Sequence, residues 1–429
     1  MKSRHRSILA ILAGTTTALS AQQPLGEAVQ QQTHTKPEEI ISSSPLLSFH
    51  RNIVDIPSVS EYEKNVGEYI IDFLHSQNLT VEKQIIPGTG KENENERFNV
   101  YAYIGEDRYP DILLTSHIDT VPPYIPYSLH NPTRRSGTFN REDLVIAGRG
   151  SVDAKGSVAA IIFAALETIK ESPNASVGLL FDVGEEQSGA GMRHFSDSDL
   201  NLTPPTYRTI IFGEPTELSL VAGHKGGIRF KLIANGKAAH SGYPWLGKSA
   251  ISAILPVLQH LEELEDISFE DGGLLSSELF GKSTLNIGLL SGGLAANVVP
   301  AYAEATVSVR LAGGSTNDTR RIIQRAVDRV TKGDGSVVVD FGDLEGGAAP
   351  QYLDVDVDGF DVITVNYGTD VSSLDIHDEG VKKVKRYLYG PGSINVAHGD
   401  NEAITVGELE EAVKGYKRLI SAALEKDSR

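Results

Sequence analysis

The sequence predicts an α/β fold in which a second domain is inserted into the first. Apolar strand-like runs alternate with helical segments in the first half of the chain, the order changes to βαββαβ in the middle, and the first pattern resumes near the end. Alternating strands and helices are typical of a sheet covered on both faces. The βαββαβ order is the split-βαβ arrangement, an antiparallel sheet with two helices on one face.

Length and composition limit the classes of protein that need to be considered. The 429 residues suffice for two or three domains, and 40% hydrophobic with 22% charged residues supply a buried core. A net charge of −18 argues against nucleic acid and anionic membrane surfaces as partners. Because the chain has no cysteine, disulfides and thiolate sites are excluded, and any metal must be held by His, Asp and Glu.

Residues 1–21 have the layout of a secretory signal peptide. Lys2, Arg4 and Arg6 precede an apolar run that is too short to span a bilayer, and small residues follow it. Export is also favoured by four N-x-[ST] glycosylation sequons, at Asn78, Asn174, Asn201 and Asn317. We therefore expect a secreted, extracellular glycoprotein, with a frayed N-terminal helix as the alternative.

The next segment, 22–44, is polar and lacks apolar periodicity, so we expect a pro-segment or a disordered lead-in. We assign 45–222 to the first part of the main domain. Its apolar positions recur at helical spacing over 63–79 and about 155–171. Strand-like runs fall at 98–104, 111–116, 176–182 and 208–213.

The pattern changes near Ala222, and we assign 223–345 to the inserted domain. Strands are expected there at 228–234, 284–290, 302–311 and 336–341, with helices at 248–264 and 317–331. The second part of the main domain is assigned to 346–429. It holds apolar segments at 359–365 and 384–389 and a final helix at 401–425.

The first candidate site residues are His117 and Asp119, which follow the predicted strand at 111–116. Residues two apart in an extended chain point to the same side, so the imidazole and the carboxylate can be neighbours. A carboxylate beside a metal-binding histidine usually orients the ring. A structural polar pair at a strand end is the alternative.

Three further acidic residues follow predicted strands or precede a helix. Asp153, flanked by glycines, either caps the helix near 155 or binds a ligand at a strand-to-helix loop. Glu185 and Glu186 follow the strand at 176–182. One of them can bind metal while the other reaches the reacting water, and a solvated acidic surface is the alternative.

Glu214 ends the strand at 208–213, and His398 follows a glycine-rich loop. Each alone would suit a structural role. Together, two histidines and three carboxylates form a mixed nitrogen and oxygen ligand set suited to zinc, cobalt or manganese. With one carboxylate bridging, such a set can hold two metals about 3.5 to 4 Å apart, which activate a water and polarise a carbonyl.

From about residue 50 to the C-terminus, eight motifs occur in one order: SHIDTVP, GRGSVDAKG, DVGEEQSGAG, GEPT, AAHSGYP, GGLAANVVP, VNYGTD and GPGSINVAHGDNE. In these motifs the sequence resembles the M20 family of metallopeptidases. This family includes carboxypeptidases, aminoacylases, acetylornithine deacetylase and succinyl-diaminopimelate desuccinylase. The resemblance implies a zinc-peptidase-like catalytic α/β domain with an inserted ferredoxin-like lid, or dimerisation, domain.

The resemblance also implies a ligand set for two Zn²⁺ ions, with Co²⁺ or Mn²⁺ as substitutes. Asp153 would bridge the ions. His117 and Glu214 would bind one ion, and Glu186 and His398 the other.

Further residues match functional positions of the family. Glu185 matches the general base, and Asp119 matches the acid that orients His117. His240 fits the residue that polarises the scissile carbonyl, often from the partner subunit, although the residues alone indicate only a polar loop position. The positions that hold the substrate carboxylate or the tetrahedral oxygen are matched by Asn297, Arg310 and Gly392.

The expected function is that of a secreted carboxypeptidase acting on peptides, with a homodimer through the lid as one option. The segments GHKGGIRF, VNYGTD and GPGSI look most like the acetylornithine deacetylase branch, so an N-acyl-amino-acid deacylase is the alternative. A non-catalytic binding protein of the same fold is a third reading, against which the intact Glu185 argues.

Overall fold

The computed structural model describes residues 36–87, 96–131, 140–342, 347–377 and 383–425. The expected signal peptide lies outside the described residues, as do residues 22–35 of the lead-in. Within the described ranges, no helix combines the length and the apolar character needed to cross a membrane.

Two helices precede the main sheet: α1 (Pro37–Ser43) and α2 (Pro45–Asp55). The expectation of a disordered lead-in is therefore wrong for its last residues. Ile40 and Ile41 of α1 are buried in the main core, and a proline starts each helix at a position where its missing N–H leaves no hydrogen bond unmade. A short run with two apolar residues is too brief to show helical periodicity in the sequence.

The main sheet has the strand order β1-β2-β6-β3-β7-β17. β6, β3, β7 and β17 run parallel, while β1 and β2 are antiparallel to their neighbours. The strands are β1 (Thr80–Ile85), β2 (Phe98–Tyr103), β3 (Ile112–His117), β6 (Val177–Asp182), β7 (Thr209–Gly213) and β17 (Lys385–Tyr389).

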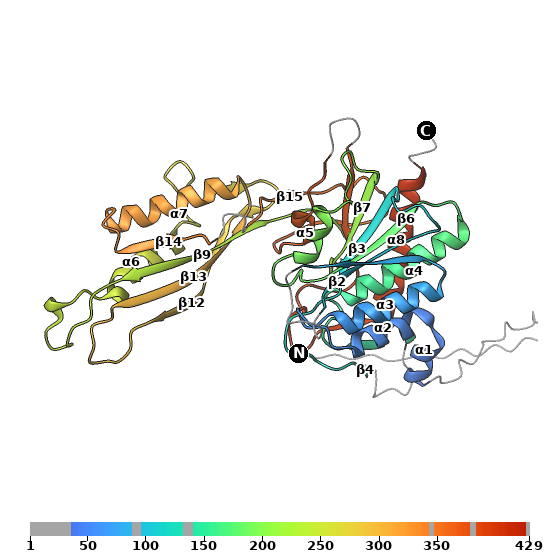
Figure 1. Cartoon of the computed structure of the whole chain (residues 1–429), viewed down its shortest axis with the longest axis horizontal. Coiled ribbons are helices and arrows are strands. Elements are labelled where there is room, and N and C mark those ends of the chain that lie inside the picture. Colours follow the sequence, from blue (N-terminus) through green and yellow to red (C-terminus); the bar gives the residue numbers. More distant parts are fainter. Residues whose placement is uncertain (1–35, 88–95, 132–139, 343–346, 378–382, 426–429) are drawn as a thin grey trace, which may run out of the picture. The chain divides into compact units, whose positions relative to one another are not determined.

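Helices and short strands cover both faces of this sheet, so every residue of β2, β3, β6 and β7 is buried. On one face, α2 packs with α3 (Lys64–Ser76), α4 (Lys155–Glu171) and α8 (Val406–Glu425). The other face carries α5 (Ala190–Ser196), η3 (Asp370–Ser373) and the three-stranded sheet β15 (Gln351–Tyr352), β8 (Leu220–His224) and β16 (Val362–Val365). Figure 1 shows α2, α3 and α4 layered along the sheet.

A small antiparallel sheet lies beside this core, in the order β18-β5-β4. It consists of β4 (Ser128–His130), β5 (Val145–Ala147) and β18 (Ala403–Thr405), and the one-turn helix η1 (Arg141–Asp143) precedes β5. The final helix was expected to begin at residue 401. It begins at Val406 because the residues before it pair with β5.

The inserted segment forms an antiparallel sheet of order β12-β13-β9-β14 with two helices against it. Its apolar residues make a core separate from those of the main sheet, which confirms the split-βαβ expectation. The domain boundaries themselves stay a prediction. The elements are β9 (Gly226–Asn235), η2 (Pro244–Leu246), α6 (Ala250–Glu263), β10 (Ser276–Ser277), β11 (Gly281–Lys282), β12 (Thr284–Gly292), β13 (Tyr302–Leu311), α7 (Thr316–Thr331) and β14 (Val337–Asp340).

Candidate active site

The candidate site lies where the parallel strands of the main sheet end. β3 ends at His117, the turn after β6 carries Glu185 and Glu186, and Glu214 directly follows β7. Because neighbouring parallel strands end at the same edge of a sheet, these side chains converge there. This edge is also where open α/β sheets bind ligands.

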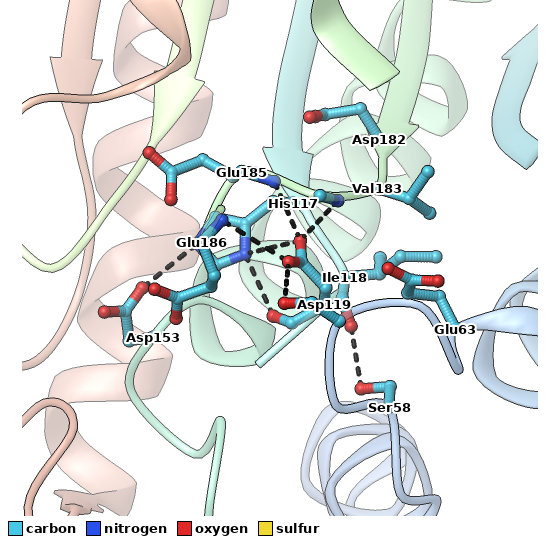
Figure 2. Close-up of polar contacts among 12 residues, drawn as sticks. Ser58, Glu63, His117, Ile118, Asp119, Asp153, Asp182, Val183, Glu185 and Glu186 are labelled. Carbon is cyan, nitrogen blue, oxygen red and sulfur yellow. Dashed lines mark hydrogen bonds and ion pairs between the residues drawn. The ribbon is translucent and has the colours of Figure 1, made fainter. Parts of the chain in front are cut away.

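Asp153 lies between two histidines. Its Oδ1 is 3.0 Å from Nε2 of His117, and its Oδ2 is 3.2 Å from Nε2 of His398. Figure 2 shows Asp153 reaching His117 at the end of its strand. Each carboxylate oxygen therefore faces a different imidazole, which is the arrangement expected of a carboxylate that bridges two cations.

The two remaining predicted ligands lie on opposite sides of this bridge. Glu186 Oε2 is 3.0 Å from Nε2 of His398, and Glu214 Oε1 is 3.9 Å from Nε2 of His117. Ligand atoms of His117, Asp153 and Glu186 all lie within 4.8 Å of one another. The structure thus brings all five residues together as imidazole and carboxylate donors, a set that fits a pair of zinc-like cations.

Asp119 connects the His117 end of the site with the glutamate turn. Its Oδ1 accepts hydrogen bonds from the backbone N–H groups of Gly184 (2.9 Å) and Glu185 (3.1 Å), and its Oδ2 accepts from Glu186 N–H (3.3 Å). Ser60 Oγ donates a further bond to Oδ2 (2.7 Å). Nδ1 of His117 is 3.0 Å from the Asp119 carbonyl oxygen and 3.5 Å from its Oδ1.

Asp119 therefore does more than orient one imidazole, because it also fixes the backbone of the turn that carries both glutamates. Figure 2 shows its carboxylate directed at that turn, while the carboxylate of Glu185 extends away from it. This second contact could not be seen in the sequence.

The protonation of the site reflects its crowded carboxylates. Hydrogen bonds with Asp153 and Glu186 raise the pKa of His398 to about 10. Burial raises the pKa of Glu185 to about 8, against the opposing effect of His117. Although burial opposes it, hydrogen bonds with His117 and His398 hold the pKa of Asp153 below its usual value. These shifts arise because imidazoles and carboxylates, the donor types that zinc-like cations bind, are packed against one another.

Two of the predicted substrate-site residues lie next to each other in the inserted domain. The backbone of His240 forms an isolated bridge with Val298, and Ser241 N–H donates to the Asn297 carbonyl (3.0 Å). His240 is exposed, and its Nδ1 accepts from Gly242 N–H (3.1 Å). The structure brings His240 and Asn297 together, and their roles stay predictions.

Arg310 and Gly392 lie in different surroundings. Arg310 is on β13, and its Nη1 would be 3.5 Å from a methyl group placed on Gly368 of the VNYGTD segment. Gly392 has φ of +77°, and a Cβ there would be 2.7 Å from Val152, the neighbour of Asp153. Gly392 is therefore required for packing beside the bridging residue, and a substrate role for either position stays a prediction.

The four sequons differ in accessibility. Asn78, Asn174 and Asn317 are exposed. Asn201 is buried, and its amide donates hydrogen bonds to the carbonyls of Ser196 (2.8 Å) and Asp375 (2.9 Å). A glycan would replace one of the two amide hydrogens that make these contacts, so Asn201 is the least accessible of the four sequons, and glycosylation at all four stays a prediction.

Sequence reasoning missed three charged or polar residues around the site: Ser60, Arg149 and Glu402. Ser60 binds Asp119, while Arg149 and Glu402 form a buried ion pair beside Asp153. The only signal for the pair was a charged residue within each of the GRGSVDAKG and AHGDNE motifs, where a solvated loop is the ordinary interpretation.

Comparison with known proteins agrees with this geometry. The family model of the peptidase dimerisation domain matches residues 222–334. A probable carboxypeptidase of Aspergillus oryzae is 70% identical over 419 residues, which cover 97% of this chain and 98% of that protein. The chain belongs to the M20 peptidase family. The family expectation is confirmed, and with it the class of peptidase hydrolase.

Solved structures of M20 members share the fold. A tripeptidase of Staphylococcus aureus has a TM-score of 0.68 at 18% identity, covering 90% of this chain and all of that one. An M20 metallo-carboxypeptidase of Sulfolobus solfataricus has 0.65 at 16%, covering 89% and 99%. A dinuclear metal-binding M20 peptidase of Bacillus subtilis has 0.58 at 15%, covering 90% and 99%. The expected catalytic α/β domain with an inserted dimerisation domain is thus confirmed.

Proposed function

We propose that this M20 protein is a secreted carboxypeptidase with two zinc ions, which hydrolyses the amide bond before a C-terminal residue. The observation that carries the proposal is the position of Asp153, whose two oxygens face His117 and His398. Relatives of high identity are named probable carboxypeptidases, which supports the same reaction.

When bound, the two cations supply activated water near neutral pH and polarise the scissile carbonyl. His117 and Glu214 would hold one ion, Glu186 and His398 the other, and Asp153 both. Glu185 is the proposed general base. It would take a proton from water and later deliver it to the leaving amine.

His240 is proposed to polarise the carbonyl when the inserted domain closes on the substrate. Its exposure leaves the imidazole accessible, and Gly242 N–H fixes one ring nitrogen as the acceptor. The remaining nitrogen then carries the proton that can be donated to an oxygen.

Product analysis tests the reaction most directly. The zinc-loaded protein is offered N-acetyl-Phe-Leu and N-acetyl-Leu in parallel reactions, and the leucine released in each is quantified by mass spectrometry. Release mainly from the longer substrate supports the carboxypeptidase. Release mainly from N-acetyl-Leu would establish the alternative, an N-acyl-amino-acid deacylase, for which the GHKGGIRF segment provides the argument.

The assignment of the base has its own test. Glu185→Gln keeps the size of the side chain and removes its ability to accept a proton, so it should bind two zinc ions normally and lose nearly all turnover. Unchanged zinc content is read by elemental analysis. Retained turnover would refute Glu185 as the base.

Secretion and self-association complete the proposal. The signal-peptide layout of residues 1–21 and the exposed sequons support export. The match to a peptidase dimerisation domain supports a homodimer through the inserted domain. The mature N-terminus and glycan masses of protein recovered from culture medium would test the first point.

A further inference from the structure

A buried ion pair, Arg149 with Glu402, lies next to the proposed ligands without belonging to them. Each residue is only 2% exposed, and Nη1 of Arg149 is 2.7 Å from Oε2 of Glu402. A buried ion pair is no more stabilising than well-packed apolar residues would be, because both charges lose their water. A role other than stabilising the fold must therefore be sought in the other contacts of the two residues.

The topology of the small sheet brings these two residues together. β18 pairs with β5 antiparallel, with Ala403 opposite Ala147, and Gly148 N–H donates to the Glu402 carbonyl (3.1 Å). The loop after β5 leads to Asp153, and the loop before β18 contains His398. Arg149 and Glu402 therefore stand where the two ligand-bearing loops leave a common sheet.

Glu402 holds the backbone of the bridging ligand. Its Oε1 accepts hydrogen bonds from the N–H groups of Val152 (3.0 Å) and Asp153 (3.1 Å). Asp119 does the same for the turn of Glu185 and Glu186. A carboxylate whose oxygens accept backbone N–H groups in a buried site fixes that backbone strongly, because charge-assisted bonds are stronger than neutral ones.

Arg149 holds the other loop. Its Nη2 donates to the His398 carbonyl (3.3 Å), and its Nη1 donates to the Gly399 carbonyl (3.1 Å). A third bond runs from Nε to the Pro123 carbonyl (3.3 Å). His398 has φ of +64°, which is uncommon for a residue other than glycine and requires support from its surroundings.

We propose that Arg149 and Glu402 are positioning residues that set the distance between Asp153 and His398, and thereby the affinity for the cation that these two ligands share with Glu186. The inference rests on the proposed two-metal site. Each residue is buried and acts through a ligand loop.

Removing Arg149 and removing the Glu402 carboxylate should affect the two metal ions differently. Loss of Arg149 releases the His398 loop but leaves His117 and Glu214 in place, so it weakens one cation. Loss of the Glu402 carboxylate also disturbs Asp153, which faces both histidines, so it weakens both. Altered outer contacts of a metal ligand typically lower metal affinity 10- to 100-fold.

The test compares the purified wild-type protein with Arg149→Met and Glu402→Gln. Metal-free protein is titrated with Co²⁺ against a chelating indicator, and the visible absorption of bound Co²⁺ reports ligand geometry. Arg149→Met should bind one ion at wild-type affinity and the other about 10- to 100-fold more weakly, with altered absorption for the second ion only. Glu402→Gln should weaken both ions.

Arg108→Met is the control, since Arg108 forms ion pairs of similar length with Glu82 (2.8 Å) and Asp199 (2.8 Å) on elements outside the site, although these pairs are more exposed. It should keep both affinities. If Arg149→Met does not fold, Arg149→Lys, which keeps the charge and loses the fork, is read in the same titration.

If the folded Arg149 variants bind both metal ions with the affinities of the wild-type protein, the inference is overturned and the proposed function remains intact. A wild-type protein that binds fewer than two ions would overturn the two-metal site itself, and the inference with it.

Discussion

At the scale of single residues, Asp119 makes more contacts than are needed to orient one metal ligand. Its carboxylate accepts hydrogen bonds from three backbone N–H groups and from the Ser60 hydroxyl. Its carbonyl oxygen and its Oδ1 both lie near Nδ1 of His117. One buried side chain therefore fixes an imidazole and the turn of the two glutamates together.

Replacing Asp119 with Asn should lower metal affinity by about 10- to 100-fold and reduce turnover with it. The amide nitrogen cannot accept from Glu186 N–H, so the turn and the imidazole lose their common anchor. Zinc competition and steady-state kinetics measure both effects. Asp111→Asn, just before the start of the same strand, is the control, since its carboxylate forms an ion pair with Arg208 (3.3 Å) outside the site. Equal behaviour of the two variants would contradict the role of Asp119.

The buried His50 of α2 makes stability depend on pH. Its Nε2 donates to the Ser151 carbonyl (3.0 Å), and its Nδ1 is buried without a hydrogen-bond partner. Burial, helped by the charge of Lys155, lowers the pKa of His50 from 6.5 to about 4. Between these two values the unfolded chain binds more protons than the folded one, so the free energy of unfolding falls as the pH falls.

This difference corresponds to a loss of about 3 kcal/mol between pH 6.5 and pH 4. In His50→Gln, which can keep the bond to Ser151, the pH dependence of unfolding by urea should be flatter by about that amount. The exposed His75 supplies the control variant, His75→Gln. A pH profile of His50→Gln that runs parallel to that of the wild type would disprove the assignment.

The ligands could be predicted from the sequence because each follows an apolar strand or a glycine-rich loop, where a charged side chain stands out. Ser60, Arg149 and Glu402 could not. They act through hydrogen bonds to backbone groups distant in the sequence, and nothing in their local sequence says which loop will lie beside them.

At the scale of elements, helices and central strands are predicted where their apolar residues extend over many positions, whereas the edge strand β1, which has no fully buried residue, is not predicted. The strands of the small sheet are three residues long, which is too short for any period to be visible. For the same reason the helix predicted at 401–425 includes the residues of β18. This missed sheet is the one that places Arg149 beside Glu402.

The connection between the two cores depends on a glycine at residue 226. The segment after β8 pairs with the returning chain through two hydrogen bonds, Gly227 N–H to the Ala348 carbonyl and Ala348 N–H to the Gly227 carbonyl, both 2.9 Å. A Cβ on Gly226 would be 2.2 Å from the Ala348 carbonyl oxygen, whereas a Cβ on Gly227 would have 3.6 Å to its nearest neighbour.

We expect Gly226→Ala to separate these two segments and to lower the free energy of unfolding by about 1 to 3 kcal/mol, as overpacking does elsewhere. Gly227→Ala, one residue away, should be close to neutral. Urea unfolding of both variants measures the difference. A Gly226→Ala protein as stable as Gly227→Ala would show that the connection can open without cost.

At the scale of the whole molecule, the proposed homodimer has a candidate contact in β12. β12 is an edge strand of its sheet, bonded only to β13 among the described strands. Edge strands with exposed apolar residues are prone to pair with another chain. Here Leu289 is 69% exposed, Leu290 55%, and Leu294, just beyond the strand, 96%. A second copy of this chain would cover them symmetrically, as two-fold contacts do.

Replacing Leu289 and Leu294 together with Lys should therefore convert the dimer to a monomer, because two like charges from each copy would meet in a contact that excludes water. Sedimentation equilibrium measures the mass directly. Leu279→Lys, in the β10–β11 hairpin of the same domain, places one charge on an exposed leucine away from β12 and should leave the mass unchanged.

Each copy has its own complete set of five proposed ligands, so the monomer should still bind two metals per chain. A monomer that also lost turnover on the preferred substrate would show that a residue of the partner subunit completes the site, with His240 as the first candidate. A double variant that remained dimeric would show that the contact does not involve β12.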